Sequence, residues 1–146
     1  MDQMDRKILT ILQENARTPL KQIAEQVFLS SPAVSARIER LEAAGIITGY
    51  QAQLSCAALG YQIKAFINLE VEPSRKPEFY PYIESVPNVM ECDCVTGDYS
   101  MLIKVAFRTT QELDQFINHL QHFGRTRTQI VFSTAVEHRG VSAAEE

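Results

Sequence analysis

The chain has 146 residues, of which 45% are hydrophobic and 22% are charged, and its formal net charge is −4 at pH 7. This length suffices for one large domain or two small ones with ordinary cores, and the negative charge argues against indiscriminate binding to polyanions. Because the sequence has no signal peptide, no long apolar run and an odd number of cysteines, three, we expect a soluble cytoplasmic protein.

The first predicted element is a helix over residues 2–14. Its apolar side chains recur at helical spacing and should face a core; they are Met4, Ile8, Ile11 and Leu12. Asn15 is suited to end this helix in the left-handed conformation.

A second helix is predicted directly after this stop. Thr18 is its expected cap, with Pro19 at the first helical position, where a missing N–H does no harm. The side chains expected on its core-facing side are Leu20, Ile23, Ala24 and Val27. A tight turn at Phe28 and Leu29 should follow.

A third helix, a glycine stop and a strand complete this part of the chain. Ser30 is a good cap, and the expected core-facing residues are Val34, Ile38 and Leu41. Gly45 should end the helix, Ile46 should fold back onto it, and residues 46–50 should form a strand. Three helices and a wing are typical of a winged helix-turn-helix.

The outer face of the third helix carries candidate contacts to DNA. Hydroxyls near its start suit base edges and arginines further along suit phosphates; these residues are Ser31, Ser35, Arg37 and Arg40. Arginines opposite an apolar stripe are equally common on a solvated face of an all-α protein, and this pattern alone leaves both interpretations open.

The distribution of charge is more informative than its sum. Residues 1–50 contain six Lys/Arg and six Asp/Glu, whereas residues 51–146 contain eight and twelve, so the whole negative excess is C-terminal. Asp2 and Asp5 belong to the first helix. The basic residues around the helix-turn-helix are Arg17, Lys21, Arg37 and Arg40.

After a connector over residues 51–60, strands and helices alternate. Residues 61–71 read as a half-buried strand, with Phe66 as an apolar exception on the polar face. A helix over residues 77–85 contains Pro81, which should delay or kink it. Two strands, 88–96 and 101–107, should be joined by a hairpin at residues 97–100.

The chain then returns to a helix and a last strand. The helical face is formed by Leu113, Phe116, Ile117, Leu120 and Phe123, and the strand is expected over residues 126–137. The order βαββαβ predicts an α+β fold with a ferredoxin-like second domain. One sheet face would be uncovered, and Phe66 on it predicts self-association.

Nearly the whole chain resembles the Lrp/AsnC family of transcription regulators. The motifs that carry this resemblance are MDQMDRKIL at residues 1–9, NAR at 15–17, LSSPAVSARIERLE at 29–42, GIITGY at 45–50 and VTGDYSMLIKV at 95–105. Their order and spacing are specific. The resemblance implies a winged helix-turn-helix domain at 1–50, with the helix-turn-helix at about 20–39, a hinge at 51–60 and an effector-binding and oligomerisation domain at 61–146.

The resemblance also implies partners and an effector site. We expect a regulator that binds pseudo-palindromic double-stranded DNA as a homodimer or a higher assembly of dimers, up to an octamer, and that is modulated by an amino acid. The implied effector-binding residues are Gly97, Asp98, Tyr99, Ser100, Thr126 and Thr128. From the residues alone, Gly97 and Asp98 are equally well explained as a hairpin turn.

Four positions depart from the family pattern. Phe28 replaces a frequent glycine, which predicts an unusual backbone conformation, and Ala36 and Glu39 replace frequent basic residues. Ser100 replaces the second acid of the Gly-Asp-Tyr-Asp motif. An effector-independent DNA-binding regulator is therefore an alternative.

The cysteine and histidine patterns do not indicate catalysis. Cys92 and Cys94 are expected to be buried apolar cysteines, and His119 and His122 surface residues, so we expect no catalytic residue, no metal and no cofactor. A sirohaem decarboxylase subunit has a similar two-part architecture and is an alternative of another class. A pure metabolite-binding protein is a third, although it would leave Arg37 and Arg40 without a task.

Overall fold

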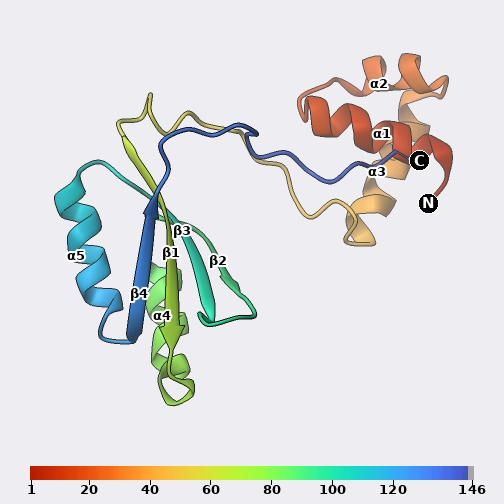
Figure 1. Cartoon of the computed structure of the whole chain (residues 1–146). Coiled ribbons are helices and arrows are strands. Elements are labelled where there is room, and N and C mark those ends of the chain that lie inside the picture. Colours follow the sequence, from red (N-terminus) through yellow and green to blue (C-terminus); the bar gives the residue numbers. More distant parts are fainter. Residues whose placement is uncertain (145–146) are drawn as a thin grey trace. The chain divides into compact units, whose positions relative to one another are not determined.

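The computed structural model describes residues 1–144, and the chain forms two compact units. The helical unit contains residues 1–53 and, as far as it is described, the segment 137–144; the sheet unit contains residues 54–136. Figure 1 labels the elements of both. The segment 137–144 is grouped with the helical unit because of its contacts with that unit.

The helical unit is built on three helices, α1 (Gln3–Glu14), α2 (Leu20–Val27) and α3 (Ser31–Ala43). Their buried core consists of Ile8, Ile23, Ala24, Val27 and Val34. The start of α1 is a capping box, in which the Asp2 carboxylate accepts from the Asp5 N–H and the Asp5 carboxylate accepts from the Asp2 N–H, both at 2.9 Å. The predicted three-helix core is confirmed.

Two helix ends differ from the prediction. Asn15 has φ −149° and ψ 99°, which is extended and not left-handed, because its side chain accepts the Arg17 N–H and directs the chain into a turn. Pro19 is the residue that precedes α2, and its ring gives the chain the required φ without a side-chain cap. The Thr18 hydroxyl instead donates to Asn15 O at 2.7 Å.

The end of α3 agrees with the prediction. Gly45 is left-handed at φ 68°; its N–H donates to Glu42 O, and the Ile46 N–H donates to Leu41 O. This pair of bonds is the Schellman motif.

The expected strand over residues 46–50 does not form among the described residues. The N–H groups of Ile46 and Ile47 both donate back to Leu41 O, so neither is available to a strand partner. The Tyr50 hydroxyl donates to the Glu42 carboxylate on α3 at 2.8 Å. The wing position is therefore occupied by an unpaired segment that starts with a bend at residues 46–47.

The segment 137–144 contacts α1 through two hydrogen bonds. Gln13 Nε2 donates to Val141 O at 2.8 Å, and Arg6 donates to Ala143 O at 3.1 Å. A β-carbon added to Gly140 would lie 2.6 Å from Gln13 Nε2, so the backbone passes close to this side chain. In Figure 1 the blue end of the trace runs beside α1.

The sheet unit is a four-stranded antiparallel sheet in the order β2-β3-β1-β4. The strands are β1 (Ile63–Val71), β2 (Val89–Cys94), β3 (Met101–Phe107) and β4 (Gly124–Ile130). The helices α4 (Lys76–Ser85) and α5 (Thr110–Leu120) cover one face (Figure 1), and a short 3₁₀ turn, η1 (Pro73–Arg75), precedes α4. This is the predicted ferredoxin-like arrangement, and the fold is α+β.

Two details differ from the expected elements. Pro81 lies inside α4, which nevertheless starts at Lys76, one residue before the predicted start, so the proline does not delay the helix. The last strand ends at Ile130 and not at Glu137. The paired register with β1 ends at Ala65 and Ile130, and the bond from Val131 N–H to Lys64 O is the last that the described residues form between the two backbones.

The core of this unit lies between the sheet and its two helices. Alternate residues of β1 are fully buried there, namely Ala65, Ile67 and Leu69. Phe66 is half-buried on the opposite face, beside Lys104 of β3 and Gln129 of β4, as the sequence predicted. No helix in the described part of the chain is long and apolar enough to cross a membrane.

Candidate functional site

The start of α3 presents the two serines predicted to reach DNA. The Ser30 hydroxyl accepts from the Ala33 N–H at 3.3 Å and so fixes the first turn. Ser31 and Ser35 are half-buried. The Ser35 hydroxyl donates to the Glu39 carboxylate at 3.1 Å, which places a negative charge beside the predicted base contacts.

Arg37 lies in an ion-pair cluster that joins α3 to the start of α1. Its Nη1 atom is 2.7 Å from Asp2 Oδ2 and 2.8 Å from Asp5 Oδ1, and only 24% of its side chain is exposed. Arg40 Nη2 lies 3.1 Å from the same Asp5 carboxylate, but 62% of its side chain is exposed. The sequence did not predict this structural role. Because Arg37 and Arg40 have such a role, their presence no longer argues against a pure metabolite-binding protein.

The cluster keeps both carboxylates ionised. The Asp5 N–H and the Arg37 guanidinium lower the pKa of Asp2 to about 2. Burial acts to raise the pKa of Asp5, but hydrogen bonds from the Asp2 N–H and from Arg37 outweigh it, and the pKa lies below its ordinary value. Asp5 is 1% exposed, so this buried charge depends on its partners.

The other two basic residues predicted to meet DNA are exposed. Arg17 lies in the loop after α1 and Lys21 in the first turn of α2. Within the described part of the chain neither side chain forms a hydrogen bond or an ion pair. Both guanidinium and ammonium groups are therefore accessible to phosphates.

The turn between α2 and α3 has an unusual centre. Phe28 is left-handed, with φ 56° and ψ 43°, and it is the one non-glycine residue of the described chain with positive φ. Its side chain is 90% exposed, although Val27 before it is buried. The predicted unusual backbone conformation is confirmed.

The loop at Gly97–Ser100 joins β2 to β3 as the predicted hairpin. Val95 N–H donates to Ser100 O at 2.9 Å, and Gly97 has φ 109°, a conformation that side chains rarely adopt. A β-carbon added to Gly97 would meet nothing within 4 Å. Asp98 is exposed, and its side chain forms no hydrogen bond or ion pair with the described residues, so its carboxylate is available to a ligand.

Ser100 is used within the fold. Its hydroxyl accepts from the Val71 N–H at 3.0 Å and donates to Leu69 O at 3.3 Å, which ties the start of β3 to the end of β1. This position, where the family has an acid, is thus occupied by a structural hydrogen-bond bridge.

The predicted threonines lie on the other side of the sheet from Tyr99. Thr126 and Thr128 pair with Leu69 and Ile67, whose side chains are buried under the helices, so both threonines face the helix-covered side. Arg125 faces the open side, 5.3 Å from the Tyr99 ring centroid. One chain therefore does not bring the six predicted effector residues into one pocket.

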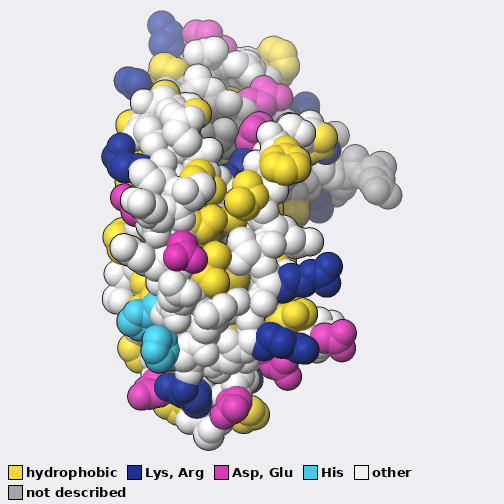
Figure 2. All heavy atoms as spheres, turned by 60° about the vertical axis from the view of Figure 1, so that its left-hand side comes forward, with side chains coloured by type: hydrophobic (Ala, Val, Ile, Leu, Met, Phe, Trp, Pro, Cys, Tyr) yellow, Lys and Arg dark blue, Asp and Glu magenta, His cyan; other side chains and the backbone are white. Residues whose placement is uncertain are grey.

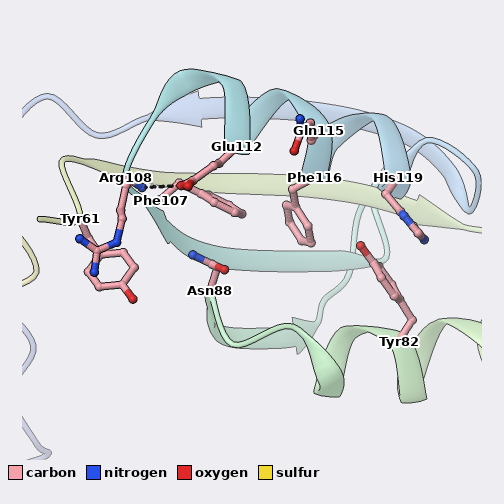
Figure 3. Close-up of a pocket in the computed structure, with 9 residues that line it drawn as sticks. All are labelled: Tyr61, Tyr82, Asn88, Phe107, Arg108, Glu112, Gln115, Phe116 and His119. Atoms are coloured by element: carbon pink, nitrogen blue, oxygen red, sulfur yellow. Dashed lines mark hydrogen bonds between the residues drawn. The ribbon is translucent and has the colours of Figure 1, made fainter.

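A groove of about 490 Å³ between α4, α5 and the end of β3 was not predicted (Figure 3). Tyr82 and His119 point toward one another, with ring centroids 4.3 Å apart and planes 8° apart. Arg108 lies over the Tyr61 ring at 4.6 Å, and Asn88 donates to Ala106 O at 2.8 Å. The Arg108 and Asn88 side chains are thus engaged within the protein.

The histidines and cysteines differ in how far they are exposed. His119 and His122 are exposed with ring centroids 5.7 Å apart, and Figure 2 shows histidine side chains together on the surface. The prediction that Cys94 is buried was wrong: it is exposed, because β2 is an edge strand and leaves this side chain uncovered. Cys92 is half-buried, and burial raises the pKa of its thiol. Residues 1–144 contain no group of three potential metal ligands.

Comparison with protein families identifies both units. Residues 1–48 match the model for winged helix-turn-helix DNA-binding domains, and residues 64–141 match the model for the Lrp/AsnC ligand-binding domain. The chain belongs to the Lrp/AsnC family. It is a DNA-binding transcription regulator of this type.

Relatives of this Lrp/AsnC regulator align with nearly its whole length. It is 33% identical to the transcriptional regulator LrpA of Bacillus subtilis, over 90% of this chain and 97% of LrpA. The structure of E. coli AsnC matches with a TM-score of 0.87 at 33% identity, over 97% and 98% of the two chains. A feast or famine regulatory protein of M. tuberculosis, complexed with L-methionine, matches with a TM-score of 0.90 at 27% identity, over 97% and 98%. These relatives give the decarboxylase alternative no support.

Proposed function

We propose that this Lrp/AsnC regulator binds pseudo-palindromic double-stranded DNA as a homodimer or a higher assembly of dimers, up to an octamer, and that an amino acid modulates the binding. The observation that carries the DNA contact is the serine-capped start of α3, which presents Ser31 and Ser35, with the exposed Arg40 further along the same helix. As regulation of transcription takes place on DNA, we propose a cytoplasmic location and no catalytic activity.

The residues of the DNA interface have distinct roles in this proposal. Ser31 and Ser35 approach base edges in the major groove, where a hydroxyl can donate or accept. Arg17, Lys21 and Arg40 hold phosphates, because their charged groups are accessible. Arg37 acts first as a positioning residue, since both its acidic partners lie at the start of α1 and set the angle between the two helices.

Assembly through the open face of the sheet would place two recognition helices on one site. Phe66 and Leu102 form an apolar centre on this face, between Lys64 and Lys104. Burial of this face against a second copy would stabilise a dimer. Two such helices about one DNA turn apart, ~34 Å, fit a pseudo-palindromic site.

The amino-acid site is proposed at the Gly97 loop. The open space beside Gly97 lets a ligand approach the backbone, and the Asp98 carboxylate can pair with an ammonium group. Tyr99 and Ser100 belong to the same loop, whereas Thr126 and Thr128 lie on the helix-covered face of the sheet. A second copy of the chain would therefore have to complete the site. The related M. tuberculosis protein has been solved with L-methionine, which makes a small amino acid the first ligand to test.

A second candidate is a DNA-binding regulator without an effector. The observation in its favour is Ser100, whose hydroxyl is committed to Val71 and Leu69 and which replaces an acid. Under this alternative the Gly97 loop is a hairpin turn only.

Mobility-shift titration of the protein on the DNA upstream of its own gene, with and without each common amino acid, tests the proposal. We expect specific binding to this DNA and a change in affinity with at least one amino acid. Specific binding with no response to any amino acid, together with no heat in calorimetry, would select the effector-independent alternative. Absence of specific binding to any upstream region would contradict the proposed DNA interface.

A further inference from the structure

Phe28 occupies a position that a smaller residue would fill at lower free-energy cost. Its backbone must be left-handed to end α2, and both its own N–H and the Leu29 N–H donate to Ala24 O. Glycine or asparagine adopts this conformation readily, whereas an L-residue with a bulky side chain is strained in it. The turn itself therefore does not require phenylalanine.

The ring contributes nothing to the core of the helical unit. It is 90% exposed, whereas Val27 is 2% exposed and Leu29 packs against the core cluster. An exposed phenyl ring leaves apolar surface in water, and here that cost is added to the backbone strain. Residues kept in a strained conformation cluster at binding surfaces, so this outlier indicates a contact outside the described chain.

The place of Phe28 in the fold indicates what it contacts. It lies two residues before Ser30, the cap of α3, and the start of α3 is the end of a recognition helix that reaches base edges. In this mode of binding the first helix of the pair crosses the sugar-phosphate backbone, so the turn that leads from it into the groove lies near that backbone. DNA offers apolar surface there through deoxyribose carbons and, at the groove edge, thymine methyl groups.

We propose that Phe28 is a DNA-contacting residue that packs its ring against a deoxyribose or a thymine methyl group beside the start of α3. This rests on the DNA-binding function of the family. The contact is apolar and adds affinity without neutralising a phosphate, so its signature differs from that of Arg40.

The test compares full-length Phe28→Gly with the unchanged protein for stability and for DNA binding at several salt concentrations. Glycine relieves the strain, so the unfolding temperature should be at least that of the unchanged protein. DNA affinity should nevertheless fall about three- to thirtyfold, as for loss of part of a buried aromatic surface, while the salt slope stays the same. Val141→Ala, which shortens another exposed apolar side chain of this unit, should change neither quantity.

Phe28→Leu is a control for misfolding, because it keeps an apolar side chain on the same backbone. It should restore much of the DNA affinity that Phe28→Gly loses. Unchanged affinity in Phe28→Gly would overturn the proposal. A change in oligomer size with intrinsic DNA affinity intact would also overturn it and would assign the ring to a protein contact. A lower unfolding temperature of Phe28→Gly would contradict the strain on which the inference rests.

Discussion

The guanidinium of Arg37 on α3 donates to the buried carboxylate of Asp5 on α1 across 2.8 Å. The two residues are 32 positions apart in the chain, and their contact fixes the recognition helix against the first helix. Asp5 is nearly inaccessible to water, so its charge is tolerated only while Arg37, Arg40 and the Asp2 N–H surround it.

Replacement of the two arginines should therefore give different results. Arg37→Ala should lower the unfolding temperature of the helical unit and weaken DNA binding indirectly, because Asp5 loses its shortest contact. Arg40→Ala should weaken binding across all DNA sequences and reduce the salt slope by about 1, with a smaller effect on stability. Thermal unfolding and titrations at several salt concentrations would separate them, and an unchanged slope for Arg40→Ala would remove it from the phosphate contacts.

Glu39 gives a complementary prediction with the opposite sign. Its carboxylate accepts from Ser35 and lies beside the proposed base contacts, where it repels phosphates. Glu39→Gln should raise DNA affinity severalfold at low salt, and the gain should shrink as salt increases. Glu14, an exposed acid at the end of α1, provides a control, and Glu14→Gln should have little effect. Equal gains from both variants would indicate net charge and not position.

Acid should destabilise the helical unit selectively. The pKa values of Asp2 and Asp5 are lowered on folding, so their stabilising effect is present above the unfolded value near 3.8 and is lost as pH falls toward about 2. Circular dichroism of the full chain between pH 5 and pH 2 should show loss of helix in this range. In Asp2→Asn the acid transition should be smaller, and a transition of unchanged size would show that other groups control it.

Some of these features could be read from the sequence and others could not. The strand Met101–Phe107 was predicted to the residue, because an apolar run bounded by a glycine turn and a polar cap is a local signal. The unusual backbone of Phe28 was predicted from the family resemblance, in which glycine is frequent at this turn, and the structure shows it to be left-handed.

The features that the sequence did not predict depend on distant parts of the chain. The end of β4 at Ile130 depends on its pairing with β1, and the partners of Arg37 lie at the start of α1. The return of residues 137–144 to α1 rests on two hydrogen bonds to backbone carbonyls, which leave no trace in side-chain pattern. Periodicity reports which face of an element is buried, but it does not report what covers that face.

Ser100 should prove more important for stability than an ordinary loop serine. In Ser100→Ala the Val71 N–H, which is buried, loses its acceptor, at a cost of about 1–3 kcal/mol in the free energy of unfolding. Urea denaturation would measure this. Ser85→Ala is a matched control, because its exposed hydroxyl only donates to Tyr82 O, and it should change stability by less than about 0.5 kcal/mol.

The open sheet face should control assembly. Phe66→Glu would place a carboxylate at the apolar centre of this face, and sedimentation should then show a smaller species than the unchanged protein, for which we expect at least a dimer without DNA. Val95→Glu, at an exposed loop position, is the control. If Phe66→Glu keeps the oligomer size while remaining folded, the dimer forms through another surface.

The effector response provides the last prediction. The Gly97 loop and Arg40 belong to different units, so a ligand can alter DNA binding only by favouring one arrangement of paired domains over another. The coupling should accordingly be modest, on the order of 1–3 kcal/mol. Asp98→Ala should abolish the amino-acid response, since the exposed carboxylate is the proposed partner of the ammonium group, while DNA affinity without ligand stays nearly unchanged.

Asp114→Ala, which removes another exposed carboxylate on α5, should keep the response, and it separates loss of the ammonium partner from loss of charge. Calorimetry with the same amino acids should give binding heat for Asp114→Ala and none for Asp98→Ala. If both variants bind the ligand as the unchanged protein does, Asp98 is only a turn residue, and the ammonium must be held by a group that the second copy of the chain supplies.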